Sequence, residues 1–292
     1  MWKRTTNGKV LHFYLAGINN QNFLMRDKET GTWWQQITGQ AIYGPMKGAQ
    51  LERVLSDELT FGEWKSEVGD GKVLAPVAKY VKEYESDWEP KTAKYPVPIS
   101  FPGTELKSRD VVVGLSLEGT SRAYPWDTLV KQSPVVDRIH DTPLLVAVGP
   151  DGKSFRVFVS RIDGKDAEFF LKADSEPATP ATAAAVNPQS GDAKAANPKP
   201  ADAKTSEAKS SDTKPADTKP ADIKPNAATT AAPPAVPKPW ILLDTATASE
   251  WNFQGCAVSG PAQGKCLDRV PALKDYWFDW RNYHHDTSVY KH

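Results

Sequence analysis

Short runs of apolar, β-branched and aromatic residues, separated by turn residues, occupy the middle of the chain. These runs predict strands at 111–117, 135–139, 144–148, 155–162 and 167–171. Gly-Pro-Asp-Gly at 149–152 and the Asp-Gly turn within 162–165 predict tight hairpins between neighbouring strands. Because the strands are short and follow one another closely, the pattern predicts an antiparallel, mainly β fold.

Short helices are predicted at three places. Thr60 and Glu63 form a capping box that opens a helix reaching Val68. Asp127 is placed to cap a second helix at 128–131. Near the C-terminus, four residues have the spacing of one helical face: Leu273, Trp277, Trp280 and His284.

The stretch 175–239 has a different composition from the rest of the chain. It holds 12 of the 24 prolines, and 18 of its 21 apolar residues are Ala. It contains no Phe, Trp, Tyr, Leu, Met or Cys. Such a stretch buries too little apolar surface to offset the entropy of ordering. We therefore predict a disordered Ala/Lys/Pro-rich insertion at 175–238. Its preferred role is that of a spacer, and partner binding is the alternative role.

The chain also repeats itself. Residues 39–74 align with 255–290 at a constant offset of 216, with 11 identities in 36 positions. The shared residues include Gly-x-Ala, Gly-Pro-x-x-Gly and a later Trp, which is Trp64 in one copy and Trp280 in the other. An earlier block pairs Arg4 with Arg161 and Gly8 with Gly164, one residue being dropped in the turn. Such self-similarity predicts two related modules.

The repeat predicts how the chain is divided. We expect a truncated first module at 1–80, because residues 109–157 have no counterpart before it. A connector follows at 81–108, and the second module comprises 109–174 together with 239–292. The disordered insertion thus interrupts the second module, which is tolerable because loop-closure entropy grows slowly with length.

The charge balance and the pattern of apolar residues argue against several classes of protein. The 36 basic residues balance 36 acidic ones, which argues against a nucleic-acid-binding protein. With no apolar run of 18 residues, we expect no transmembrane helix, and no signal segment follows Met1-Trp2-Lys3-Arg4. No phosphate-loop, dinucleotide or nucleophile-elbow motif is present, and we expect no cofactor.

One mixed polar set stands out as candidate chemistry. Arg122, Tyr124, Asp137 and His140 offer an acid, a base and a cation in the front half of the second module. Asp27 and its repeat partner Asp244 are alternatively an acid or the anchor of an Asx-turn. The repeated arginines, Arg53 and Arg269, are alternatively binding cations or partners of a carboxylate.

The two cysteines are ten residues apart and flank a turn. Cys256 and Cys266 take the places of Gln40 and Gln50 in the other copy, so both positions change together. They form either a disulfide, stabilising by about 3 kcal/mol in the loop-entropy model, or two independent thiols. With His284 and His285 they have the ligand count of a zinc site, but not its usual spacing, so we expect no metal.

Aromatic residues are candidates for sugar stacking. Four of the ten tryptophans recur in both copies and are better read as core: Trp34, Trp64, Trp251 and Trp280. Trp33 and Tyr276 are the better surface candidates, because their repeat partners, Glu250 and Thr60, are polar.

Several motifs together resemble the prokaryotic family of unknown function numbered 3179, DUF3179. Asp27-x-x-Thr-Gly-Thr-Trp-Trp is followed by Gly39-x-Ala-Ile-x-Gly-Pro-x-x-Gly, and the chain ends in Trp280-x-x-x-His-x-Asp-Thr-x-Val. The resemblance covers almost all of the chain outside the insertion. It implies a β-rich, often exported protein without an established activity. Gly149 stands where the family has Cys before Pro, so no redox or thiolate-metal role carries over.

Three functional hypotheses follow. The preferred one is a non-catalytic binding or structural module of the cell envelope, with an envelope polymer or protein as partner. The alternatives are a hydrolase or oxidoreductase using the Arg122 set, and a degenerate inactive family member. The resemblance and the composition of the insertion favour a periplasmic or extracellular location. Substrate, oligomeric state and the redox state of the cysteines do not follow from the sequence.

Overall fold

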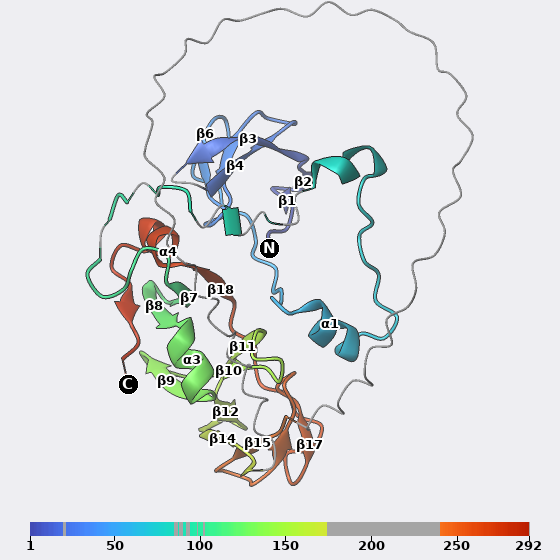
Figure 1. Cartoon of the computed structure of the whole chain (residues 1–292), viewed down its shortest axis with the longest axis vertical. Coiled ribbons are helices and arrows are strands. Elements are labelled where there is room, and N and C mark those ends of the chain that lie inside the picture. The colour runs from blue at the N-terminus through green and yellow to red at the C-terminus, as the bar shows by residue number, and fades with distance from the viewer. Residues whose placement is uncertain are drawn as a thin grey trace, which may run out of the picture. The chain divides into compact units, whose positions relative to one another are not determined.

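Within the part of the chain that the structure describes, most of the regular secondary structure is small β-sheets joined by tight turns (Figure 1). The computed structural model describes residues 1–19, 22–84, 87, 90–91, 94–97, 99–101, 103–173 and 240–291. The predicted insertion at 175–238 lies outside the described residues. All strand pairs are antiparallel except β8 with β19, which are parallel. The mainly antiparallel β prediction is therefore confirmed.

The N-terminal part forms a hairpin, β1-β2, and a four-stranded sheet in the order β3-β4-β5-β6. Two short helical segments, α1 and η1, follow the sheet. Their bounds are β1 Thr5–Thr6, β2 Lys9–Val10, β3 Phe13–Asn19, β4 Asn22–Asp27, β5 Trp33–Gln35, β6 Ala41–Tyr43, α1 Phe61–Glu67 and η1 Ala78–Glu83.

The middle of the chain contributes a three-stranded sheet, β11-β10-β9, and two strands, β7 and β8, of the four-stranded sheet β18-β7-β8-β19. Helix α3 packs against β7, β8 and β10. The bounds are β7 Val111–Leu117, β8 Thr120–Pro125, α3 Trp126–Gln132, β9 Val135–Ile139, β10 Thr142–Val148 and β11 Phe155–Val159.

The C-terminal part adds a hairpin, β12-β13, and a four-stranded sheet in the order β14-β15-β16-β17. It then supplies β18, α4 and β19 to the sheet of β7 and β8. The bounds are β12 Arg161–Ile162, β13 Lys165–Asp166, β14 Phe169–Leu171, β15 Leu242–Asp244, β16 Glu250–Trp251, β17 Ala257–Ser259, β18 Ala272–Tyr276, α4 Trp277–Tyr283 and β19 Ser288–Val289.

The two four-stranded sheets that carry the repeated motifs are built in the same way. In the first, the fully buried Asp27 accepts hydrogen bonds from the backbone of Thr30 and from the indole of Trp34, at 2.6 and 2.8 Å. In the second, Asp244 accepts from the backbone of Thr247 and from the indole of Trp251. Each Asp thus anchors a turn and orients a core tryptophan, so these two acids are structural.

The predicted Asp-Gly turn at 163–164 and the equivalent Asn-Gly turn at 7–8 are both tight hairpins. Asn7 and Gly8 have φ of 48° and 74°, and Asp163 and Gly164 have φ of 50° and 78°. Positive φ at both positions matches the right-handed twist of the strands they join, and Asn, Asp and Gly tolerate it best. Because the two turns have equal length, Thr5 rather than Arg4 corresponds to Arg161, and no residue is dropped.

The three helix predictions differ in accuracy. Helix α1 begins after Thr60, whose hydroxyl accepts from the backbone of Glu63, while the Thr60 N–H donates to Ser154 instead of closing the capping box. Asp127 was wrongly predicted as a cap: α3 begins one residue earlier, and Pro125 is its N-cap. Leu273 lies in β18, because pairing with β7 overrides its helical spacing.

Two large buried clusters form the core of the second half of the chain. One gathers around Phe158, Trp240 and Trp251, and the other around Leu115, Tyr124 and Val146. A smaller cluster in the N-terminal sheet includes Leu11, Trp34, Ala41 and Leu51. The described residues belong to one compact unit.

Candidate functional site

Three of the four polar residues predicted to act together meet, from strands β8 and β9. Arg122 Nη1 and Tyr124 Oη both donate to Asp137 Oδ2, at 2.6 and 2.7 Å. His140 is bonded elsewhere, its Nε2 lying 2.6 Å from the hydroxyl of Thr120. The predicted set is therefore a trio, with the imidazole directed at another partner.

The trio is satisfied internally. Tyr124 is fully buried and stacks on Tyr290, with the ring centroids 5.2 Å apart. Burial raises the pKa of Tyr124, and its bond to Asp137 raises it further. Burial alone would lower the pKa of Arg122, but the hydrogen bond and charge of Asp137 outweigh it and raise that pKa. Arg122 and Tyr124 thus stay protonated at neutral pH, and each already has its partner.

The two aromatic residues proposed as sugar platforms lie in different sheets. Trp33 belongs to β5, and the guanidinium carbon of Arg26 lies 5.8 Å from its ring centroid. Tyr276 ends β18, stacks with Phe278 and has the guanidinium carbon of Arg109 5.4 Å from its ring. Both side chains are half-buried. Each ring therefore already has a cation beside it.

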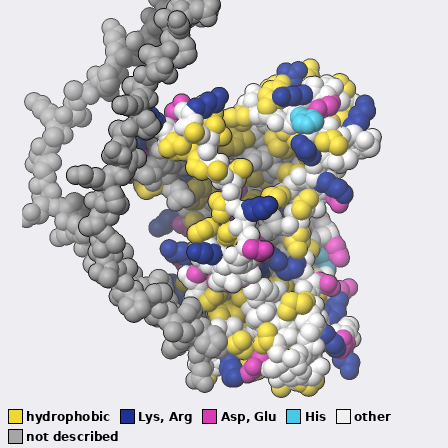
Figure 2. Space-filling model, turned by 90° about the vertical axis from the view of Figure 1, so that its right-hand side faces the viewer, with side chains coloured by type: hydrophobic (Ala, Val, Ile, Leu, Met, Phe, Trp, Pro, Cys, Tyr) yellow, Lys and Arg dark blue, Asp and Glu magenta, His cyan; other side chains and the backbone are white. Residues whose placement is uncertain are grey.

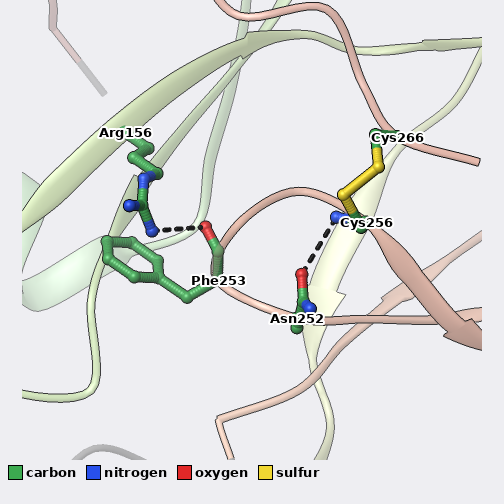
Figure 3. The surroundings of a disulfide bond; sticks show 5 residues. All are labelled: Arg156, Asn252, Phe253, Cys256 and Cys266. Atoms are coloured by element: carbon green, nitrogen blue, oxygen red, sulfur yellow. Dashed lines mark hydrogen bonds between the residues drawn. A yellow bond between two sulfur atoms is a disulfide. The ribbon is translucent and has the colours of Figure 1, made fainter. Parts of the chain in front are cut away.

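Cys256 and Cys266 are joined in a disulfide (Figure 3). The two residues also form an isolated antiparallel bridge, and Gln40 and Gln50 form the same bridge in the N-terminal sheet. The backbone of Cys256 donates to the side chain of Asn252 at 3.0 Å. The disulfide thus closes the turn between two positions that are paired in both copies.

The adjacent histidines point to different neighbours. His284 stacks on Trp280 with the ring centroids 3.6 Å apart, and burial lowers its pKa. His285 stacks on Phe101, also at 3.6 Å. Among the described residues, no group of three or more His, Cys, Asp or Glu side chains is arranged to hold a metal.

A polar cleft that the sequence did not reveal lies where β18 and α4 meet residues of the N-terminal part. Its volume is about 340 Å³. Asn22 donates from its side-chain amide to both oxygens of Asp279, at 2.5 and 2.6 Å. We call this the Asp275–Asp279 cleft; its lining includes Trp2, Asn22, Arg53, Lys274, Asp275 and Asp279.

Burial raises the pKa of both carboxyl groups of the cleft. Burial, together with the charge of Asp279, raises the pKa of Asp275 to about 8. Burial also raises the pKa of Asp279, although hydrogen bonds from Asn22 and Asp275 oppose the rise. At neutral pH, Asp275 therefore keeps its proton.

Arg53 supplies the matching positive charge. It is exposed, and within the described part of the chain its guanidinium makes no ion pair. Its carbon lies 6.0 Å from the ring centroid of Trp2. By contrast, the corresponding Arg269 is paired with Asp57. The ammonium of Lys274, which also lines the cleft, donates to the carbonyl of Lys153.

One sequence signal could have revealed this cleft. At the offset of 216, Asp275 corresponds to Leu59 and Asp279 to Glu63. A change from an apolar residue to an acid between the copies marks a position whose surroundings differ. The partner Asn22 could not have been found in this way, because 257 residues separate it from Asp279.

Small antiparallel sheets with few and short helices define a mainly β protein. The family model described as "Protein of unknown function (DUF3179)" matches residues 1–287, and the chain belongs to this family. The resemblance drawn from the Asp-x-x-Thr and Gly-Pro-x-x-Gly motifs is thereby confirmed. No curated protein and no solved structure matches the chain.

Proposed function

We propose that the protein is a non-catalytic binding module of the cell envelope, and that the Asp275–Asp279 cleft binds a neutral ligand rich in hydroxyl groups, such as an envelope glycan. The observation that carries the proposal is the pairing of donors and acceptors in the cleft. Asp279 accepts hydrogen bonds, whereas Arg53 and Asn22 donate them. A hydroxyl group can use both kinds of partner at once.

The charge of the cleft supports a neutral ligand. The lining carries charged groups of both signs, since Asp279 is acidic whereas Arg53 and Lys274 are basic. On the face drawn in Figure 2, basic and acidic side chains are interspersed with hydrophobic ones instead of forming a field of one sign. A polyanion or polycation would find no such field to bind on that face.

Two features support an envelope location. The Cys256–Cys266 disulfide is of the kind that persists in oxidising compartments such as the periplasm or the cell exterior. The Ala/Lys/Pro-rich composition of residues 175–238 suits a spacer in an envelope protein. Within the described residues, no helix is long and apolar enough to cross a bilayer.

The enzymatic alternatives receive less support from the geometry. The Arg122 trio is closed, and His140 is bonded to Thr120, so no acid–base pair faces an open site there. At Gly149, an added Cβ would lie 2.8 Å from the ring of Phe253. The side chain of Phe253 therefore fills the space that a cysteine would need, as expected of a chain that functions without the family thiol.

The proposal is tested by titration calorimetry of the whole chain with a soluble N-acetylglucosamine tetramer, a neutral glycan. We expect a Kd on the order of 0.1–1 mM, corresponding to about 4–5.5 kcal/mol. Asp279→Asn should weaken binding by about tenfold or more, because a hydrogen bond to a charged acceptor contributes about 1.5–3 kcal/mol.

The matched control is Asp163→Asn, which changes an exposed acid in the β12–β13 turn. This variant should bind the tetramer as the unaltered protein does. The proposal is wrong if the tetramer does not bind, or if the two variants lose the same affinity.

A further inference from the structure

Helix α1 is held to the second half of the chain by polar contacts. None of its residues is buried, whereas five residues are buried in its repeat counterpart, α4. Arg156 of β11 donates to Glu67 near the end of α1, at 2.6 Å. Thr60 is the N-cap of α1, and its hydroxyl donates to Asp151 of the β10–β11 loop, also at 2.6 Å. We call these two contacts the α1 clasp.

The loop between β10 and β11 depends on the same carboxylate. Asp151 accepts from the hydroxyl of Ser154 at 2.6 Å, and that hydroxyl accepts from the backbone of Thr60 at 2.9 Å. Burial alone would raise the pKa of Asp151, but hydrogen bonds from Ser154 and Thr60 outweigh it and lower that pKa. Asp151 is therefore ionised at neutral pH, and α1 begins beside a fixed negative charge.

Glu63 adds an acid between the two ends of the clasp. It lies one helical turn before Glu67, and it interacts with Glu67, Asp151 and Arg156. Arg156 is already shared between Glu67 and Asp57, at 2.6 and 2.8 Å. An ionised Glu63 would therefore add a carboxylate where Arg156 already balances two.

The surroundings of Glu63 favour its neutral form. Burial, followed by the charges of Glu67 and Asp151, raises the pKa of Glu63 to about 7, although the charge of Arg156 opposes the rise. A hydrogen bond with Glu67 raises this pKa further. Lys274 of β18 is a second cation beside the loop, and it acts on Asp151.

We propose that the α1 clasp is a pH-sensitive contact between the two halves of the chain, tight while Glu63 is protonated and loosened once Glu63 is ionised. The protonated acid shares a hydrogen bond with Glu67, whereas the ionised one repels Glu67 and Asp151. When α1 is released, the pKa of Glu63 returns to its ordinary value of about 4.3. Docking of α1 is therefore strongest below that value and weakens as pH rises through 7.

The test is hydrogen exchange of the whole chain at pH 5.5 and pH 8.5, expressed as protection factors so that the intrinsic pH dependence of exchange is removed. Protection of the α1 amides at 64–68 should fall by about tenfold between the two values. One titrating proton allows up to about tenfold for each pH unit, and solvent screening of a half-buried carboxyl reduces this effect.

Glu63→Gln should remove the pH dependence, because an amide stays neutral and can still bond Glu67. The matched control is Glu83→Gln, which changes an exposed glutamate of η1 and should leave the tenfold fall in place. The measurement needs no ligand, so its outcome is independent of the proposed glycan binding. The proposal is contradicted if protection of α1 does not fall with pH, or if it falls equally in the Glu63→Gln variant.

Discussion

Replacing Arg156 by methionine should lower the free energy of unfolding by about 3–5 kcal/mol, the cost of breaking a buried ion pair from one side. Only 3% of Arg156 is exposed. Its guanidinium bonds Asp57 at 2.8 Å and Glu67 at 2.6 Å, and lies 4.6 Å from the ring centroid of Phe253. It also donates to the Phe253 carbonyl (Figure 3).

The loss is large because Glu67 would remain buried without its cation. Asp57 is affected less, since it keeps its bond to Arg269. The double variant Arg156→Met, Glu67→Gln should therefore be more stable than the single variant, because it also removes the buried carboxylate of Glu67 that has lost its cation.

Urea unfolding followed by tryptophan fluorescence measures these differences. The control is Arg138→Met, whose ion pair with Asp166 is half exposed and should contribute much less to stability. Equal losses in the Arg156→Met and Arg138→Met variants would show that the buried pair does not join residues 57–67 to β11.

The second large effect concerns pH. The pKa of Asp275 is raised to about 8 in the folded chain and is about 3.9 in an unfolded one. The folded state therefore holds an extra proton between these values. The stability that this proton contributes is complete below about pH 4 and is lost as pH rises through 8.

Asp275→Asn should remove this dependence, because an amide resembles the protonated acid at every pH. The difference in unfolding free energy between the variant and the unaltered chain should be small at pH 4. It should grow to several kcal/mol in favour of the variant at pH 9, at about 1.4 kcal/mol for each pKa unit. Urea unfolding at both pH values measures the difference.

The control for the pH experiment is Asp163→Asn. Asp163 lies outside the cleft, and its variant should lose as much stability between pH 4 and pH 9 as the unaltered chain. If Asp275→Asn and the unaltered chain lose stability in parallel from pH 4 to pH 9, Asp275 does not carry the extra proton.

Local patterns in the sequence predicted the local structure. The alternating and β-branched runs placed β7 and β9 at their observed bounds, and Thr60 marked the start of α1. The parallel pairing of β19 with β8 was not predictable in this way. It brings together residues 166 positions apart, such as Arg122 and Ser288, and no local signal encodes that distance.

The difficulty of predicting contacts between residues far apart in the sequence also explains why the cleft and the buried ion pair were not predicted. Arg122, Tyr124 and Asp137 lie within 16 residues of one another, so their meeting could be anticipated from short strands and turns. The cleft depends on Asn22 reaching Asp279, and the buried ion pair on Arg156 reaching Asp57. Both contacts join the two copies of the repeat, and self-comparison of a sequence does not show how copies pack.

The most direct test of the proposed function is an NMR titration of the whole chain with the N-acetylglucosamine tetramer. The side-chain amide of Asn22 is the reporter, because it donates to both oxygens of Asp279 inside the cleft. We predict that this amide and the Nε–H of Arg53 shift together and saturate at the calorimetric Kd. Shifts confined to Trp33 and Tyr276, or no shift at Asn22 when the tetramer is bound, would contradict the assignment of the cleft as the ligand site.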